Sequence, residues 1–232
     1  MNRYRTLFFD LDHTLWDFEA NSYATLDYIY RSFELDKSGI VDFEAFYQVY
    51  KAHNERLWDR YRKGFIKREE LKWKRMWLAL LDFKIANEKL AREMAAVFIE
   101  LLPRQQQLFP HTIEVLDYCK AKSYDLSLIT NGFEDTQWKK LETTGLSAYF
   151  SHVITSEKSN SVKPEPGIFE YALNLTNSNA DQALMIGDNL DVDIAGAMGA
   201  GIDQVYFNPG KQDHEHKPTF EIACLRELLE IL

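Results

Sequence analysis

Leu7-Phe8-Phe9-Asp10-Leu11-Asp12-His13-Thr14 is the stretch that decides the fold of this 232-residue chain. A short apolar run that stops at polar residues is typical of a buried strand in a parallel sheet. Open α/β sheets bind their ligands beyond the carboxyl ends of such strands, where this sequence places Asp10 and Asp12. Crowded carboxylates favour a cation between them, and Mg²⁺ prefers oxygen ligands. Taken alone, the stretch is also compatible with a strand that leads into a capped helix.

Two later stretches repeat the pattern of an apolar run that ends in polar residues. Asp125–Gly132 (DLSLITNG) ends in a hydroxyl, an amide and a glycine, groups that suit phosphate binding at a strand-to-helix turn but also occur in ordinary turns. Ala183–Asp193 (ALMIGDNLDVD) ends in a glycine and three acids. These acids fit an oxygen-rich metal site or, alternatively, an acidic helix start.

Lys163 lies in a short loop that two prolines stiffen. The segment Ser161–Gly167 reads SVKPEPG, so Pro164 and Pro166 hold the lysine in a defined place. A lysine ammonium is a compact charge that suits phosphate, although a lone lysine in a loop is usually only solvated. Its interpretation as a phosphate ligand therefore depends on the other three segments.

In sequence order, these four segments resemble the haloacid dehalogenase superfamily of phosphohydrolases. That family combines D-x-D-x-T, a strand that ends in threonine, a lysine, and G-D-x-x-x-x-D, and all four patterns occur here. The resemblance extends from Leu7 to the region of Phe207. It implies an α/β fold, in which a Rossmann-like parallel sheet core carries an inserted all-helical cap of the C1 type. The strand that precedes Asp10 would then lie in the centre of the sheet.

The resemblance also implies roles for individual residues. Asp10 would be the nucleophile that forms an aspartyl-phosphate, and Asp12 would be the general acid toward the leaving alcohol and then the general base toward water. Lys163 would neutralise the phosphoryl group and restrain Asp10. The other expected site residues are the phosphate-binding Thr130 and Asn131, the Mg²⁺ ligands Asp10, Asp12 (through its backbone carbonyl) and Asp188, and the supporting Thr14 and Asp193. We assign no role to His13 and leave the role of Asp191 open.

Residues 17–103 differ from the rest of the chain, because aromatic and charged residues follow each other at helical spacing. Phe43, Phe46, Tyr47 and Tyr50 illustrate the spacing of three and four. We expect a catalytic core from residues 1–16 and 104–232 and a cap domain from residues 17–103. The expected cap helices are 18–35, 42–62, 67–82 and 87–102, and the expected core strands are 4–10, 124–130, 151–155, 183–187 and 203–207, with a last helix at 225–232.

Composition narrows the class of partner. The formal charge of −9 disfavours nonspecific binding to nucleic acid polymers and to anionic membranes. No stretch approaches the ~18 consecutive apolar residues of a membrane span. Cys119 and Cys224 provide neither a disulfide framework nor metal-site spacing. We expect a cytoplasmic enzyme that acts on a small phosphorylated metabolite, while the oligomeric state stays open.

Two stretches point to a branch of the family. Trp16-Asp17-Phe18 and Thr130–Gln137 (TNGFEDTQ) resemble the pyrimidine 5′-nucleotidase branch. This implies a 5′-nucleotidase acting on pyrimidine nucleoside monophosphates, and Asp12 favours a phosphatase or phosphomutase over a dehalogenase. The alternatives are a phosphatase of phosphoglycolate, sugar phosphates or N-acylneuraminate 9-phosphate, a β-phosphoglucomutase-like phosphomutase, and a non-enzymatic nucleotide or sugar-phosphate sensor.

Overall fold

The computed structural model describes residues 3–232, which divide into two compact units. One unit combines the segment through Phe18 with Gln106–Leu232, and the other contains Glu19–Gln105. Each boundary lies two residues later than the expected one, at Phe18 instead of residue 16 and at Gln105 instead of residue 103. The helical unit is thus inserted into the chain between the first two strands of the sheet.

The first unit is built on a six-stranded parallel sheet in the order β3-β2-β1-β4-β5-β6. The strands are β1 (Thr6–Phe9), β2 (Asp125–Thr130), β3 (His152–Thr155), β4 (Ala183–Gly187), β5 (Asp203–Phe207) and β6 (Phe220–Ile222). The first strand lies between β2 and β4, as expected for the centre of the sheet. Our strand prediction missed β6, because three residues that include a charged Glu221 form no apolar run.

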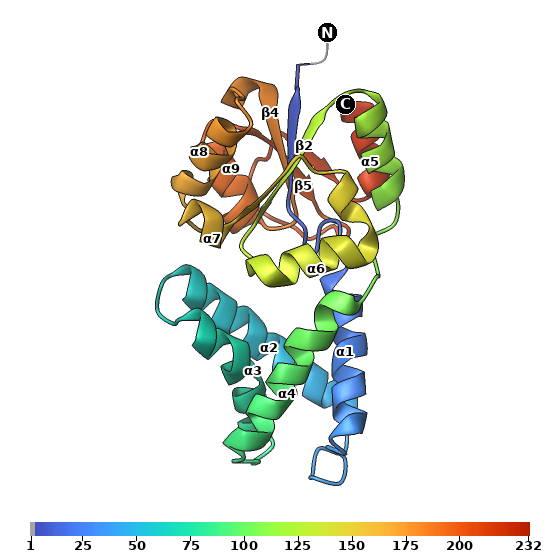
Figure 1. Cartoon of the computed structure of the whole chain (residues 1–232), viewed down its shortest axis with the longest axis vertical. Coiled ribbons are helices and arrows are strands. Elements are labelled where there is room, and N and C mark those ends of the chain that lie inside the picture. The colour runs from blue at the N-terminus through green and yellow to red at the C-terminus, as the bar shows by residue number, and fades with distance from the viewer. Residues whose placement is uncertain (1–2) are drawn as a thin grey trace. The chain divides into compact units, whose positions relative to one another are not determined.

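Helices cover both faces of this sheet (Figure 1), which explains why the residues of β1, β2 and β4 are almost all buried. They are α5 (Thr112–Ala121), α6 (Glu134–Thr144), α7 (Ser156–Ser159), α8 (Pro166–Leu175), α9 (Ala195–Gly199) and α10 (Leu228–Ile231). Phe8, Ile129 and Met185 form a buried cluster with Phe169 of α8. Each such side chain contributes about 1.5–3 kcal/mol by leaving water, so the central strands are firmly anchored.

The strand register brings the polar residues of the motifs to one edge of the sheet. Phe9 pairs with Leu128 of β2 and with Ile186 of β4. The next backbone N–H, that of Asp10, donates to the carbonyl of Ile186 over 2.9 Å. All three strands are parallel, so the residues that follow their carboxyl ends lie side by side.

The second unit contains the four expected helices. They are α1 (Phe18–Ser32), α2 (Phe43–Arg62), α3 (Arg68–Asp82) and α4 (Glu88–Leu101). Asp42 caps α2 by accepting from the backbone N–H of Glu44, and Asn87 caps α4 by accepting from that of Leu90. These side chains satisfy N–H groups that have no partner within the helix, so each helix begins where its capping residue stands.

The helical unit has a small core of its own. Phe46, Tyr50 and Phe98 are buried within it, and Arg75 is buried against the Phe98 ring and donates to Asn54. The regularly spaced aromatic residues therefore mostly serve the packing of this unit. None of the helices among residues 3–232 is long and apolar enough to cross a lipid bilayer.

Candidate active site

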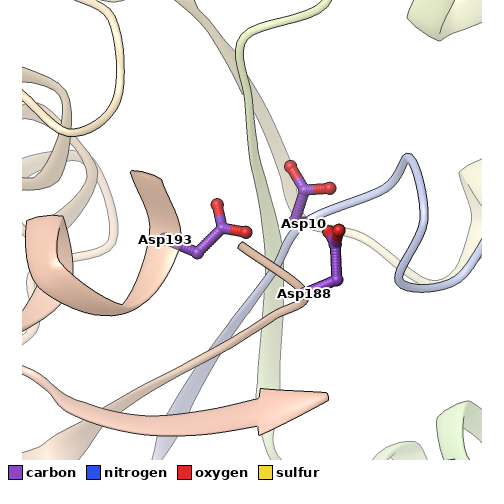
Figure 2. Close-up of side chains that lie close together, drawn as sticks. All are labelled: Asp10, Asp188 and Asp193. Atoms are coloured by element: carbon purple, nitrogen blue, oxygen red, sulfur yellow. The ribbon is translucent and has the colours of Figure 1, made fainter. Parts of the chain in front are cut away.

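Three aspartates meet at the carboxyl edge of the sheet. Asp10 follows β1, Asp188 follows β4, and Asp193 lies in the short helical turn Leu190–Ile194. Carboxylate oxygens of the three residues lie within 4.8 Å of one another, and Figure 2 shows the side chains turned toward a common point. Asp10 and Asp193 are buried and Asp188 is half-buried. Carboxylates this close repel one another strongly, so the cluster requires positive charge.

Lys163 provides part of that charge. Its ammonium donates to Asp10 Oδ1 over 2.5 Å, to Asp193 Oδ1 over 2.6 Å and to the carbonyl of Ile129 over 2.7 Å. These bonds use all three of its hydrogens. Burial alone would lower the pKa of Lys163, but the two carboxylates raise it above its ordinary value. The lysine is therefore a permanent cation at the centre of the site.

The amide of Asn131 holds the backbone of Lys163 in place. Asn131 Nδ2 donates to the Lys163 carbonyl over 2.9 Å, and the Lys163 N–H donates to Asn131 Oδ1 over 2.8 Å. Both ends of this side chain are occupied by the lysine loop. The side chain of Asn131, which we expected among the phosphate-binding groups, is thus engaged in supporting Lys163, and only its backbone N–H is left for phosphate.

The remaining negative charge of the cluster suits a divalent cation. Burial raises the pKa of Asp10, and the neighbouring Asp193 raises it further, although Lys163 lowers it. Burial also raises the pKa of Asp188, and the charges of Asp193 and Asp10 add to this effect. Asp193 has both oxygens occupied, by Lys163 and by the N–H of Asn189. Asp10 Oδ2 and Asp188 Oδ2 accept no hydrogen bond from residues 3–232. These two oxygens fit the ligand preference of Mg²⁺.

Gly187 and Thr14 complete the surroundings of the aspartates. A Cβ atom at Gly187 would lie 2.5 Å from Asp193 Oδ2, so only glycine leaves room for that carboxylate. The hydroxyl of the buried Thr14 donates to Asp188 Oδ1 over 3.2 Å. Asp191 instead faces solvent and pairs with His216, so it lies outside the cluster. His13 has a φ of 66° and its ring packs against Phe18.

Asp12 turns away from the three aspartates and toward α6. Lys140 Nζ donates to its Oδ1 over 2.5 Å, and Gln137 Nε2 donates to its Oδ2 over 2.8 Å. Burial would raise the pKa of Asp12, but the Lys140 ammonium and the Gln137 amide lower it below its ordinary value. Sequence reasoning placed Gln137 in a helix without a role and missed Lys140. Their spacing of three on one helix face was the only signal available.

Thr130, the last residue of β2, presents a hydroxyl at the same edge. Its Oγ1 accepts from the N–H of Gly132 over 3.1 Å and from Gln137 Nε2 over 2.7 Å. Because both lone pairs are used, the hydroxyl hydrogen is free to donate. A buried hydroxyl donor that lies near Lys163 and next to the backbone N–H of Asn131 suits the binding of a phosphate oxygen.

Comparisons with known proteins identify relatives of this chain over most of its length. The model of a family described as haloacid dehalogenase-like hydrolase matches residues 4–201. Pyrimidine 5′-nucleotidase PynA of Streptococcus pneumoniae is 32% identical over 99% of this chain and 95% of its own length. Pyrimidine 5′-nucleotidase YjjG of Escherichia coli is 31% identical over 97% of this chain and 96% of its own length.

A solved structure is similar over the same extent. The putative HAD-hydrolase YfnB of Bacillus subtilis, in a crystal form bound to magnesium, superposes with a TM-score of 0.87 at 30% identity. The match covers 99% of each chain. The likeness therefore includes both units of the chain.

Proposed function

The chain belongs to the haloacid dehalogenase-like hydrolases, and we propose that it is a Mg²⁺-dependent 5′-nucleotidase that acts on pyrimidine nucleoside monophosphates through an aspartyl-phosphate. The observation that carries the chemistry is the buried Lys163–Asp10 pair within the aspartate cluster. A carboxylate held by a cation at the edge of the sheet is suited to attack an anionic phosphate. The similarity to PynA and YjjG supports the substrate class.

In the first half-reaction, Asp10 attacks the phosphorus of the ester. A bond forms between its carboxylate oxygen and phosphorus, the bond from phosphorus to the ester oxygen breaks, and Asp12 gives a proton to the leaving alcohol. The Thr130 hydroxyl and the backbone N–H of Asn131 orient the phosphoryl oxygens, and the Lys163 ammonium offsets their charge. Phosphoryl transfer depends mainly on such positioning and charge stabilisation.

In the second half-reaction, water attacks the aspartyl-phosphate and gives a proton to Asp12. The bond between Asp10 and phosphorus breaks, which restores the Asp10 carboxylate and releases inorganic phosphate. Because the pKa of Asp12 is lowered, its side chain is an ionised carboxylate that can accept this proton. Over one cycle, Asp12 gains one proton from water and gives one to the leaving alcohol, so the reaction is balanced in protons.

The metal would bind at the free oxygens of Asp10 and Asp188, with the backbone carbonyl of Asp12 as the further expected ligand. When bound, Mg²⁺ supplies positive charge that offsets the carboxylates and the phosphate oxygens. Asp193 would support it indirectly, because its carboxylate fixes Lys163 and accepts from the N–H of Asn189. We assign the unit Glu19–Gln105 as the cap domain of this enzyme.

The experiment is phosphate release from a panel of esters in the presence of Mg²⁺. The panel contains UMP, dUMP, dTMP, the purine monophosphates, phosphoglycolate, hexose phosphates and N-acylneuraminate 9-phosphate. We expect kcat/KM to be at least about tenfold higher for the pyrimidine nucleotides, a preference that corresponds to about 1.4 kcal/mol. A preference for a sugar phosphate or phosphoglycolate would overturn the substrate class. Absence of release from every ester would overturn the phosphatase and leave the mutase or the sensor.

A further inference from the structure

Two side chains of α6 enclose the Asp12 carboxylate without reacting in either half-reaction. Lys140 donates a hydrogen bond to Oδ1 of this carboxylate, and Gln137 donates one to Oδ2. Lys140 is 3% exposed and Gln137 is fully buried. Because each oxygen meets a different donor, the plane of the carboxylate is defined as well as its position.

Gln137 connects Asp12 to Thr130. A carboxylate oxygen only accepts hydrogen bonds, so the atom of Gln137 that faces Asp12 is its amide nitrogen. That nitrogen carries two hydrogens, and the second is donated to Thr130 Oγ1 over 2.7 Å. One amide group thus keeps the acid–base carboxylate at a set distance from the phosphate-binding hydroxyl.

Gly132, in the turn before α6, leaves the space that the Gln137 amide fills. A Cβ atom at Gly132 would lie 2.0 Å from Gln137 Nε2 and 2.4 Å from the amide carbon. Any side chain at Gly132 would therefore displace Gln137 from Thr130 and Asp12. The glycine of the TNG turn is explained by the space that this glutamine needs.

Lys140 is anchored by aromatic rings as well as by its ion pair. Its ammonium lies 4.3 Å from the centre of the Trp16 ring and 5.8 Å from that of Phe18. A desolvated ammonium gains energy over such a ring face. Trp16 is itself fully buried. The lysine is thus held from one side by a rigid ring while it donates to Asp12 from the other.

We propose that Lys140 and Gln137 are positioning residues that hold the Asp12 carboxylate beside Thr130 in one orientation for both half-reactions. This inference rests on the proposed function of the site. Reacting groups that are misplaced by about 1 Å can lose about 10²-fold in rate. Loss of either residue should therefore reduce kcat. Loss of Lys140, which donates no hydrogen bond to a phosphate-binding group, should leave the substrate affinity nearly unchanged.

The test uses Lys140→Met, which keeps the apolar stem over Trp16 and removes the charge, and Gln137→Met. Lys139→Met is the matched control, because Lys139 is the exposed neighbour on the same helix. With UMP and Mg²⁺, we expect both test variants to lower kcat by about 10- to 100-fold, and we expect KM to stay within about threefold in Lys140→Met. The control should match the wild-type enzyme. Thermal unfolding establishes that each variant is folded at the assay temperature.

Rapid-quench kinetics with p-nitrophenyl phosphate adds a readout that a merely structural role would not produce. Its leaving group needs little protonation, so phosphorylation of Asp10 should stay fast in Lys140→Met while hydrolysis of the aspartyl-phosphate slows. We expect a burst of p-nitrophenolate close to the enzyme concentration. In Lys140→Ala, added n-propylammonium should restore at least about fivefold in kcat, because it replaces the lost cation.

The outcomes separate the two proposals. If folded Lys140→Met and Gln137→Met keep the kcat of Lys139→Met, or if only KM changes, the positioning role is wrong while the phosphatase stands. Slower turnover without a burst and without rescue by n-propylammonium would also contradict it. If the wild-type enzyme releases phosphate from neither UMP nor p-nitrophenyl phosphate, the proposed function fails and the positioning role fails with it.

Discussion

Lys163 Nζ lies 2.5 Å from Asp10 Oδ1, although 153 positions separate the two residues in the chain. The same ammonium holds Asp193, so one buried cation connects β1, the lysine loop and the turn after β4. This pair gives the proposed nucleophile a single orientation and leaves its second oxygen open.

Asp10→Asn should abolish turnover, with kcat reduced by at least about 10³-fold, because an amide is no nucleophile for phosphorus. The side chain keeps its shape, so the circular dichroism spectrum should stay that of the wild-type enzyme. Asp191→Asn is the control, because Asp191 is exposed and lies outside the cluster. Turnover like that of the wild-type enzyme in a folded Asp10→Asn sample would defeat the aspartyl-phosphate mechanism.

Lys163→Met should lower the free energy of unfolding by about 3–5 kcal/mol, because it leaves buried carboxylates without their cation. Lys163 is 1% exposed and has three hydrogen bonds to lose. Urea denaturation measures the change, with Lys139→Met as an exposed control that should stay within about 0.5 kcal/mol of the wild-type protein. A Lys163→Met protein as stable as this control would show that the cluster does not depend on the lysine.

Mg²⁺ should stabilise the metal-free protein, and more so at higher pH. Burial, opposed by Lys163 and reinforced by Asp193, raises the pKa of Asp10 in the metal-free site to about 7. Between about pH 4 and this value the folded state binds more protons than the unfolded state, so this contribution to stability is lost as the pH rises. Bound Mg²⁺ would take the place of those protons as the positive charge in the site.

Differential scanning calorimetry with and without Mg²⁺ checks this. At about 100 times Kd the gain is about 2.7 kcal/mol, which is about 5–10 °C in Tm for a chain of this size. We expect the shift to be smaller at about pH 5 than at about pH 8. A shift that is absent, or that grows toward acid, would remove the aspartate cluster as the metal site.

Gly132→Ala should slow the reaction with little loss of substrate affinity. The added Cβ would meet the Gln137 amide at 2.0 Å, which forces that side chain away from Asp12 and Thr130. Gly210→Ala is the control, because its nearest contact would be an ordinary 3.6 Å. We expect kcat to fall about tenfold or more in Gly132→Ala only. Equal activity of the two variants would show that the turn tolerates a side chain and that Gln137 is not required in its place.

The apolar runs were sufficient to predict most of the sheet. Strands β1, β2 and β4 are buried on both faces except at the half-buried Asp125, so their sequences carry a mostly apolar signal, which Ser127 interrupts in β2. β6 carries no such signal, because it is an edge strand of three residues with an exposed Glu221. Helix α1 ends at Ser32, earlier than the expected residue 35, because helix ends depend on local turns more than on periodicity.

The roles of the polar side chains were harder to predict. The sequence indicated that Asp12 belongs to the site, but its partner Lys140 lies 128 positions away on a helix whose register no local pattern reveals. Asn131 stands beside Thr130 in the sequence, yet its side chain is occupied by Lys163. Polar contacts of this kind depend on rotamers and on tertiary packing, neither of which is encoded by residue spacing.

By itself, the sequence determined that Asp10, Thr130 and Asp188 share one edge of a parallel sheet, because each follows an apolar run long enough to form a buried strand. The tertiary structure alone decided which oxygen meets which donor: Lys163 on Asp10 and Asp193, and Lys140 with Gln137 on Asp12. The physical reason is that strand formation follows from local hydrophobicity. The direction of a hydrogen bond is set only when distant helices have packed against the sheet.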